Sequence, residues 1–508
     1  MSKTSHGDII PLETREFSGA LAESANQGNA QAPNSWPFSY IFDLQNDPSR
    51  LLPELPDGGT VKNLRTLAMS MHDKPADPAP GVAVPEIYTF LGQFIDHDIT
   101  LERGSNLLSG LANPVRIPPE QIREHIVNSR SPDLDLDNVY GPDIEGNVAP
   151  TDPKNADKLL VEPVARNRGL PAGKDIYNDF PRAGDGTARI GDARDAENLV
   201  LAQLHVAFLR AHNELVGRGH TFEEARMLLI QHYQWIVLDD FLERVAEPSI
   251  VKKIRHHGPR FFSPPSYSFF IPLEFSGAAY RFGHAKVRQS YNNFNEKQES
   301  AALAQLFQFT RQRVTDDWVI DWTAFLDSEN DIHYPRPIQP ALNEVLFTLQ
   351  DLQQGDRQNV PSLAERNLLR GYILGLPTGQ AVAECMASAG ITKLTGEQIK
   401  SVSVNYKDDP YRRDQDQAQV LEDAKFLTRT PLWFYILAEA AYYSRGYHLG
   451  PVGSTIVAEV LIGVLRNSTY SILSTPGWTP TLGQTKGKFD IEDLLALAGV
   501  LPCWARQL

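Results

Sequence analysis

One helical segment, YTFLGQFIDHDIT at residues 88–100, constrains the fold more than any other part of the chain. It has the apolar content of a buried helix, yet Asp96, His97 and Asp98 follow one another within it. Burying such groups is costly unless each finds a partner. Successive residues of a helix are about 100° apart, so Asp96 and Asp98 point to opposite sides of His97. We therefore expect two neighbouring sites, one on each side of this helix.

The same segment has an ordinary interpretation that these residues alone leave open. Phe90, Phe94 and His97 share one stripe of the predicted helix, and Gln93 lies one turn before His97. A histidine on such a stripe can be a hydrogen-bonded core residue, with both acids exposed to solvent.

The longest helical pattern, ARDAENLVLAQLHVAFLRAHNELVGRG, begins at residue 193. Steps of three and four place Arg194 and Glu197 on the stripe that continues with Leu201, Leu204 and Phe208. The pattern predicts one continuous helix with two charged residues on its inward stripe. The alternative is a frayed first turn in which both charges are solvated.

An acidic segment, SPDLDLDNVYG at residues 131–141, alternates Asp133, Asp135 and Asp137 with leucines. An extended conformation places these carboxylates on one face, where they repel one another unless a cation lies among them. Several anionic oxygen ligands suit calcium. The alternative is a solvated acidic turn, since the rest of an EF-hand loop is absent.

A fourth candidate is His284, in the segment AAYRFGHAKVRQSY at residues 278–291. It follows a glycine among large residues, and it could ligate a metal or donate to a carbonyl group.

The class of fold follows from periodicity and composition. The 508 residues are 42% hydrophobic, enough for a large core. Alternating strand patterns are scarce, so we predict a mostly α protein: an irregular N-terminal arm at residues 1–60 and a single large helical domain at residues 61–508, with little β-structure and long loops such as 130–190. Further helices are predicted at residues 222–247, 297–312, 362–374, 378–388, 417–426, 431–443 and 452–466.

Charge and cysteine content exclude several classes of protein. A net charge of −15 argues against a nucleic-acid partner. Two cysteines cannot form a disulfide framework or a Cys-rich zinc site. The N-terminus lacks an apolar signal, and no apolar run is long enough to span a membrane. We expect a cytoplasmic protein or one exported by a signal-independent route; the sequence does not indicate the oligomeric state.

Five motifs, in order, together resemble the animal-type haem peroxidases of the peroxidase–cyclooxygenase superfamily, and bacterial members in particular. GQFIDHD resembles the distal-histidine motif, ARDAENLVLAQLHVAFLRAHN the distal-arginine helix, SPDLDLDNVYG the calcium loop, RFGH the proximal-histidine motif, and RNLLRGYILGLP the segment that supports it. The resemblance runs from about residue 85 to the C-terminus. It implies the helical haem-peroxidase fold.

The resemblance also implies catalytic roles for three residues. His97 would be the distal acid–base, Arg194 its partner that stabilises negative charge, and Gln93 the residue beside the distal water and halide pocket. His284 would be the axial ligand of the haem iron, and Asn367 would hydrogen-bond its other ring nitrogen.

The remaining implied residues would hold the two cofactors, haem b and Ca²⁺. Asp96 and Glu197 match carboxylates that form esters with haem methyl groups, and Arg281 and Arg370 match arginines near the haem propionates. The implied calcium ligands are Asp98, Ser131, Asp133, Asp135 and Asp137, with Asp133 contributing its carbonyl.

The implied reaction is reduction of hydrogen peroxide and oxidation of small donors through a ferryl intermediate. Some family members have a methionine after the helix glutamate, which forms a third haem link; here that residue is Asn198. The expected donors are therefore bromide, iodide, thiocyanate or phenolic compounds rather than chloride.

Two other functions remain open. The first is a fatty-acid dioxygenase of the same superfamily. Its radical-forming tyrosine would stand three residues before the proximal histidine, where this chain has Arg281, whereas Tyr280 would lie on a different helical face. The second is a non-catalytic calcium-binding or adhesion protein with this fold.

Overall fold

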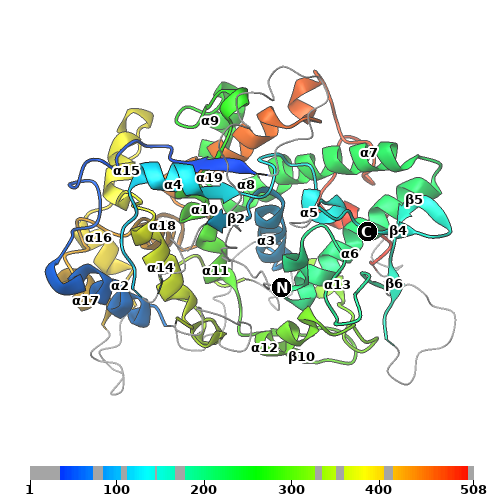
Figure 1. Cartoon of the computed structure of the whole chain (residues 1–508), viewed down its shortest axis with the longest axis horizontal. Coiled ribbons are helices and arrows are strands. Elements are labelled where there is room, and N and C mark those ends of the chain that lie inside the picture. Colours follow the sequence, from blue (N-terminus) through cyan, green and yellow to red (C-terminus); the bar gives the residue numbers. More distant parts are fainter. Residues whose placement is uncertain are drawn as a thin grey trace.

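The structure, a computed structural model, is mostly helical, as the sequence predicts. It describes residues 35–72, 84–104, 111, 113–142, 146–165, 178–326, 335–349, 360–404 and 416–501. The helix α3, Ile87–Ile99, lies at the centre (Figure 1). Every residue of α3 except Gln93 is buried. A helix that is apolar on nearly all sides belongs in the interior, which explains why α3 is enclosed by the rest of the fold.

The helices beside α3 are α6, Leu199–Gly217, and α7, Phe222–Trp235. Phe94 of α3 stacks on Phe208 of α6 with ring centroids 4.4 Å apart. A capping box at Thr221 starts α7, and the helix runs on through a π-helical turn at Ile236–Phe241 into α8, Leu242–Val245. The predicted helix at residues 222–247 is thus confirmed, with a local change of winding.

The predicted continuous helix from residue 193 is wrong at its start. Ala193–Ala196 form a 3-10 helix, and α6 begins only at Leu199. Asn198 is extended, with φ −140° and ψ 160°, and its side-chain oxygen accepts a hydrogen bond from the backbone N–H of Leu201 at 2.9 Å. Because Asn198 is the N-cap, the helical stripe of Leu201, Leu204 and Phe208 does not continue back through Arg194 and Glu197.

A second group of helices lies on the other side of α3 (Figure 1). The helices predicted at residues 362–374, 378–388, 417–426, 431–443 and 452–466 are present. They are α14, Leu363–Ile373; α15, Gly379–Cys385; α17, Gln417–Asp423; α18, Leu432–Ser444; and α19, Pro451–Asn467.

The helix predicted at residues 297–312 is confirmed only in its second half. Strand β10, Ser300–Ala302, pairs antiparallel with β9, Ser290–Asn292. Only α12, Leu303–Leu306, and a 3-10 turn at Phe307–Thr310 follow. Antiparallel pairing with β9, which ends shortly before β10 in the chain, overrides the local helical pattern at residues 300–302.

Short strands join the N-terminal segment to the body of the protein. A four-stranded sheet has the order β2-β3-β1-β8: β2, Glu102–Gly104; β3, Ile126–Asn128; β1, Trp36–Ser39; and β8, Ile271–Pro272. β1 pairs antiparallel with β3 and parallel with β8. Residues 1–34 of the predicted arm lie outside the described residues, and the boundary at residue 60 stays a prediction.

The remaining short elements lie in the loops around this core. The paired strands are β4, Thr151–Asp152, with β5, Asn155–Leu159, and β6, Glu162–Pro163, with β7, Asn178–Asp179. The helices are α2, Gly59–Ser70; α4, Pro119–His125; α5, Asp137–Tyr140; α9, Pro248–His257; α10, Leu273–Ser276; α11, Gly283–Lys286; α13, Trp322–Leu326; α16, Gly396–Ser401; and α20, Ile491–Leu497. Short 3-10 turns are Pro56–Gly58, Ser266–Ser268, Ala279–Phe282, Glu344–Phe347, Ala387–Ala389 and Ile472–Ser474.

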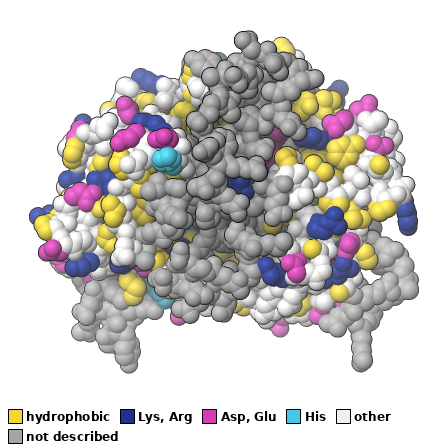
Figure 2. Space-filling model, viewed as in Figure 1, with side chains coloured by type: hydrophobic (Ala, Val, Ile, Leu, Met, Phe, Trp, Pro, Cys, Tyr) yellow, Lys and Arg dark blue, Asp and Glu magenta, His cyan; other side chains and the backbone are white. Residues whose placement is uncertain are grey.

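The surface carries both charges. Figure 2 shows acidic and basic side chains interspersed over the described part of the face in view. Among the described helices, none combines the length and apolar character that crossing a membrane requires.

Candidate functional site

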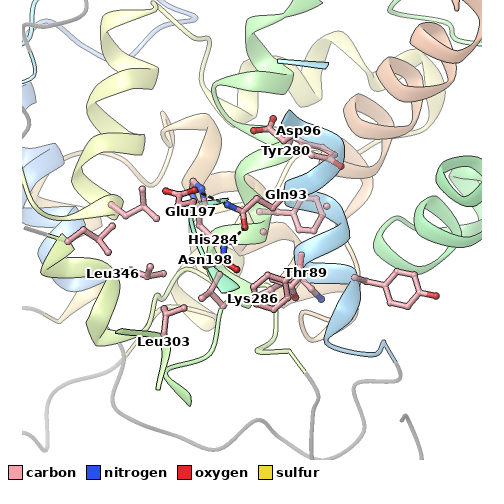
Figure 3. Close-up of a pocket in the computed structure, with 18 of the residues that line it drawn as sticks. Thr89, Gln93, Asp96, Glu197, Asn198, Tyr280, His284, Lys286, Leu303 and Leu346 are labelled. Atoms are coloured by element: carbon pink, nitrogen blue, oxygen red, sulfur yellow. Dashed lines mark hydrogen bonds between the residues drawn. The ribbon is translucent and has the colours of Figure 1, made fainter. Parts of the chain in front are cut away.

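A pocket next to α3 collects four of the predicted site residues: Gln93, Asp96, Glu197 and His284 (Figure 3). Gln93 and Asp96 line it from α3, Glu197 and Asn198 from the break before α6, and His284 from α11. The rest of the wall is largely apolar, and includes Phe90, Phe282, Val287, Leu303, Phe307, Leu346 and Leu363. Two carboxylates, a histidine and apolar walls therefore share one cavity.

The side-chain amide of Gln93 bridges the two pocket residues that follow the 3-10 helix. Its Nε2 donates to Oε2 of Glu197 at 3.0 Å, and its Oε1 accepts from Nδ2 of Asn198 at 3.2 Å. This explains why Gln93 is the residue of α3 that is not fully buried: its side chain faces the pocket. The break at Asn198 is what turns Glu197 toward it.

His284 is held by the helix that the sequence predicts to support it. The amide of Asn367 on α14 lies 2.8 Å from Nδ1 of His284. Arg281 donates from Nη1 to Oδ1 of Asn367 at 3.3 Å and from Nε to the carbonyl of Ser276 at 2.7 Å. These contacts fix the plane of the imidazole. The amide nitrogen Nδ2 of Asn367 faces Nδ1, while Oδ1 accepts from Arg281. Metal binding through Nε2 requires that Nδ1 carry the ring proton and donate it, so the amide oxygen of Asn367 must then face Nδ1.

The two predicted arginines lie near the Asp96 end of the pocket but do not line it. Arg370 is paired with Glu102. Burial lowers the pKa of Arg281 and Arg370, and attraction by the Asp96 carboxylate opposes this shift in both. Asp96 itself accepts a hydrogen bond from Oγ1 of Thr100 at 2.9 Å.

His97 does not line the pocket. Its ring is completely buried, and Nδ1 lies 2.8 Å from Oδ1 of Asp195. The other oxygen of Asp195 lies 2.8 Å from Nδ1 of His205 and accepts from Asn138 at 3.0 Å. Burial alone would raise the pKa of Asp195, but the hydrogen bonds to His205 and His97 outweigh it and hold that pKa below its usual value.

Arg194 also lies behind the pocket wall. Its guanidinium pairs with Asp192, with Nη2 2.6 Å from Oδ2, and donates to the carbonyls of His97 at 3.1 Å and Thr100 at 2.7 Å. Arg194 therefore satisfies carbonyl groups at the C-terminal end of α3. Burial opposes ionisation of Asp192, yet Arg130 and Arg194 together lower its pKa.

On the opposite side of α3, three carboxylates meet. Oxygen atoms of Asp98, Asp135 and Asp137 lie within 4.8 Å of one another. Asp98 accepts from the backbone N–H of Asp137 at 2.9 Å through Oδ1, while Oδ2 is buried with no hydrogen bond to the described residues. Burial and mutual repulsion raise the pKa of Asp98 and Asp135, as expected of carboxylates gathered without a cation.

The acidic segment differs from the predicted extended strand. Leu136 has a left-handed φ of 58°, and Asp137 opens the short helix α5. Asp133 is therefore not on the same face: its Oδ2 accepts from the N–H of Thr469 at 2.9 Å. Ser131 is adjacent to the cluster, since its Oγ donates to Asp135 at 3.2 Å. The side chain of Asp133 does not join the cluster, which leaves the carbonyl as its predicted ligand atom.

The sequence analysis did not identify two polar residues of the pocket, Lys286 and Arg366, and it considered Tyr280 only for a dioxygenase. Tyr280 and Lys286 line the pocket, and so does Arg366, one turn before Arg370 on α14. The hydroxyl of Tyr280 is buried without a hydrogen bond to the described residues. Asp195 lies between Arg194 and Glu197 in the sequence. Only its position next to Arg194 could have identified it as a candidate.

Comparison with solved structures shows the class of fold. The fold is similar to that of peroxidase A from Dictyostelium discoideum (TM-score 0.54, 16% identity, covering 87% of this chain and 89% of that one). It is also similar to a fatty acid alpha-dioxygenase from Oryza sativa (TM-score 0.53, 12% identity, covering 92% and 77%).

Sequence comparison is more specific. The family model for animal haem peroxidases matches residues 112–327. A peroxidase-like protein from Margaritifera margaritifera is 30% identical over 185 residues, which is 32% of this chain and 22% of that protein. The resemblance to the animal haem peroxidases is therefore confirmed. The chain spans less than a third of the length of the first curated relatives that it matches. A nearer likeness to bacterial members stays a prediction.

Proposed function

We propose that the protein is a haem-dependent peroxidase that reduces hydrogen peroxide and oxidises a small donor. The observation that carries this proposal is the pocket in which His284, held by Asn367, is accompanied by Asp96 and Glu197. The residues fit a haem: one oriented imidazole, apolar walls for a flat ring, and two carboxylates, Asp96 and Glu197, that could form ester links. Bound there, haem would supply the redox chemistry that no amino-acid side chain provides.

The proposed proton transfers rest on His97 and Asp195. When the Asp195 carboxylate accepts a hydrogen bond from Nδ1–H of His97, Nε2 becomes the basic nitrogen of the ring. Such a histidine takes a proton from peroxide and returns it to the departing oxygen. Gln93 and Asp96 line the pocket on the side of α3, and His97 does not line it. The proposal therefore requires that Nε2 of His97 reach peroxide bound in the pocket.

Arg194 has two proposed effects. Its charge lies beside the carbonyl of His97, where it favours negative charge that develops on peroxide. Its contacts with His97 and Thr100 also keep the end of α3 in place. The proposed donors are bromide, iodide, thiocyanate or phenolic compounds. Asp96 and Glu197 are the proposed ester sites, and Asn198 cannot form the third link.

The direct test supplies the protein with haem and measures peroxide-dependent oxidation of bromide, iodide, thiocyanate, chloride and a phenol. The proposal expects turnover of some of the first three anions or of the phenol, and little turnover of chloride. Haem-loaded protein that consumes no peroxide with any donor would contradict it.

A second candidate function, fatty-acid dioxygenation, gains support from the position of Tyr280. The sequence predicts a helical face for Tyr280 that differs from the face of Arg281, and in the structure Tyr280 lines the same pocket as His284, whereas Arg281 does not. The likeness to the Oryza sativa dioxygenase fold is compatible with this function. Oxygen uptake with linoleate that is lost in the Tyr280→Phe variant would favour dioxygenation over the peroxidase proposal.

We also propose that the carboxylate cluster binds Ca²⁺ through Asp98, Asp135 and Asp137, with Ser131 and the carbonyl of Asp133. Oδ2 of Asp98 is buried and makes no hydrogen bond to the described residues. A cation held by Asp98, Asp135 and Asp137 would stabilise this oxygen. The ion would fix the loop at residues 131–137 against α3, one residue from His97.

Calcium should raise thermal stability in a manner that depends on Asp98. At a calcium concentration 100-fold above Kd, linkage predicts stabilisation of about 2.7 kcal/mol, measured as the rise in Tm over the same protein with chelator. In Asp98→Asn this rise should shrink, whereas the exposed Asp423→Asn control should keep it. Equal Tm values with calcium and with chelator in the wild type would refute the site.

A further inference from the structure

Tyrosines are exposed together at the C-terminal end of α18. Tyr442, Tyr443 and Tyr447 are 39%, 48% and 37% exposed, and the first two belong to α18, with ring centroids 5.2 Å apart. The hydroxyl of Tyr442 accepts a hydrogen bond from Nε2 of Gln398 at 2.9 Å. Large exposed side chains scattered singly need no explanation, whereas two phenol rings in contact at one helix end are a distinct surface feature outside the proposed haem pocket.

The other end of α18 contacts the residues that hold His284. The indole Nε1 of Trp433, a buried residue in the first turn, donates to the backbone carbonyl of Arg281 at 3.1 Å. The guanidinium of Arg281 donates to Asn367, whose amide lies 2.8 Å from Nδ1 of His284. A continuous chain of hydrogen-bonded contacts therefore links the imidazole of His284 to the start of α18.

Tyr435 lies between the two ends of α18. It is completely buried, and its hydroxyl accepts from the backbone N–H of Leu394 at 2.8 Å. Burial raises the pKa of Tyr435 most, and the charges of Glu439 and Tyr443 raise it further, so Tyr443 is within electrostatic reach of Tyr435. Tyr442 follows Tyr435 by about two helical turns, or about 10 Å along the axis, and lies on the same stripe.

These side chains are of the two types that lose and regain a single electron most readily among aromatic residues. Tryptophan and tyrosine do so because the aromatic ring delocalises the unpaired electron that remains. Intermediate aromatic groups also divide a long electron transfer into shorter and faster steps. The helix α18 carries such groups from the support of His284 to solvent: Trp433, Tyr435 and the pair Tyr442 and Tyr443.

We propose that Tyr442 and Tyr443 form a surface site at which phenols too large to enter the pocket deliver electrons to it along α18. The donor class is a phenol attached to a macromolecule. This inference rests on the peroxidase function proposed above. Two such phenols each lose one electron and the hydroxyl proton, and hydrogen peroxide in the pocket takes up both electrons and two protons to become two water molecules. The tyrosines regain their electrons from the donor and are unchanged.

The first test locates the oxidised residues in the absence of any donor. Haem-loaded protein is treated with hydrogen peroxide and a nitroso spin trap, digested, and analysed by mass spectrometry. We expect trap adducts at Tyr442 or Tyr443, and their loss in Trp433→Phe with haem content unchanged. Tyr470→Phe is the control, since Tyr470 is 41% exposed but lies outside α18. Adducts found only at other residues would overturn the proposal.

The second test compares free tyramine with tyramine attached to dextran, which is too large for the pocket. The double variant Tyr442→Phe, Tyr443→Phe should lose most of the oxidation of the dextran conjugate and keep that of free tyramine. Both substitutions are at exposed rings and retain the ring, so the fold is preserved. Tyr470→Phe should oxidise both donors as the wild type does.

The outcomes separate this inference from the function on which it rests. Oxidation of the conjugate at the wild-type rate in the double variant would overturn the surface site. So would wild-type protein that oxidises free tyramine but not the conjugate, and in both cases the peroxidase function would stand. Wild-type protein that consumes no peroxide with either donor would refute the peroxidase function and the surface site together.

Discussion

Replacement of His97 by alanine should slow the reaction of haem-loaded protein with hydrogen peroxide by about 10² to 10⁴, the usual contribution of a positioned acid–base group. Stopped-flow absorption measures this second-order step directly. Haem content should stay close to that of the wild type, because His97 does not line the pocket and its Nδ1 contacts Asp195.

The matched control is His205→Asn. His205 contacts the same carboxylate as His97, at the same 2.8 Å distance, but has no proposed role in proton transfer. An equal loss in both variants would show that the buried Asp195 network is structural. A wild-type rate in the His97 variant would remove the proposed mechanism altogether.

Replacement of His284 by alanine should have the second large effect. Loss of a residue that merely orients a metal ligand costs about 10- to 100-fold in affinity, so loss of the ligand itself should weaken haem binding by more than about 100-fold. Titration of haem into the variant, followed in the Soret region, measures this. Asn367→Ala should give the intermediate loss, and the exposed His256→Ala should bind haem as the wild type does.

An unchanged haem affinity in the His284 variant would place the iron elsewhere. The same titration separates this outcome from unfolding if circular dichroism shows wild-type helicity. Because Asn367 contacts Nδ1 of His284, a loss in Asn367→Ala without a loss in His284→Ala would also contradict the assignment.

The sequence predicted the central helix and its two-sided character well. Asp96 and Asp98 could be assigned to opposite sides because helical geometry alone separates them, and the structure places Asp96 in the pocket and Asp98 in the carboxylate cluster. Most of the flanking helices also followed from apolar periodicity. These features depend on residues that are close in sequence, so apolar periodicity and helical geometry can predict them.

Other features depend on partners that a single periodic pattern does not include. The N-cap at Asn198 was visible as a helix-start residue, but the apolar run around it favoured one long helix. The strand at residues 300–302 exists because residues 290–292 pair with it. Asp195 acquires its importance only when α3 and α6 bring two histidines to its oxygens.

Tyr280 and Lys286 show the same limit at the pocket. A 3-10 helix followed by a short α-helix turns both toward the cavity that contains His284, whereas a regular helix would separate them. The winding of so short a segment is decided by its packing, which periodicity over six residues cannot resolve.

The absorption spectrum of the wild-type protein after titration with haem, before and after acidic organic extraction, tests the central claim most directly. The account predicts a Soret band that saturates at one haem per chain. After peroxide turnover, part of that band should stay with the protein through ester links at Asp96 and Glu197. A band that leaves entirely with the solvent would remove the esters and keep the haem site. No saturable Soret band at all would contradict the account.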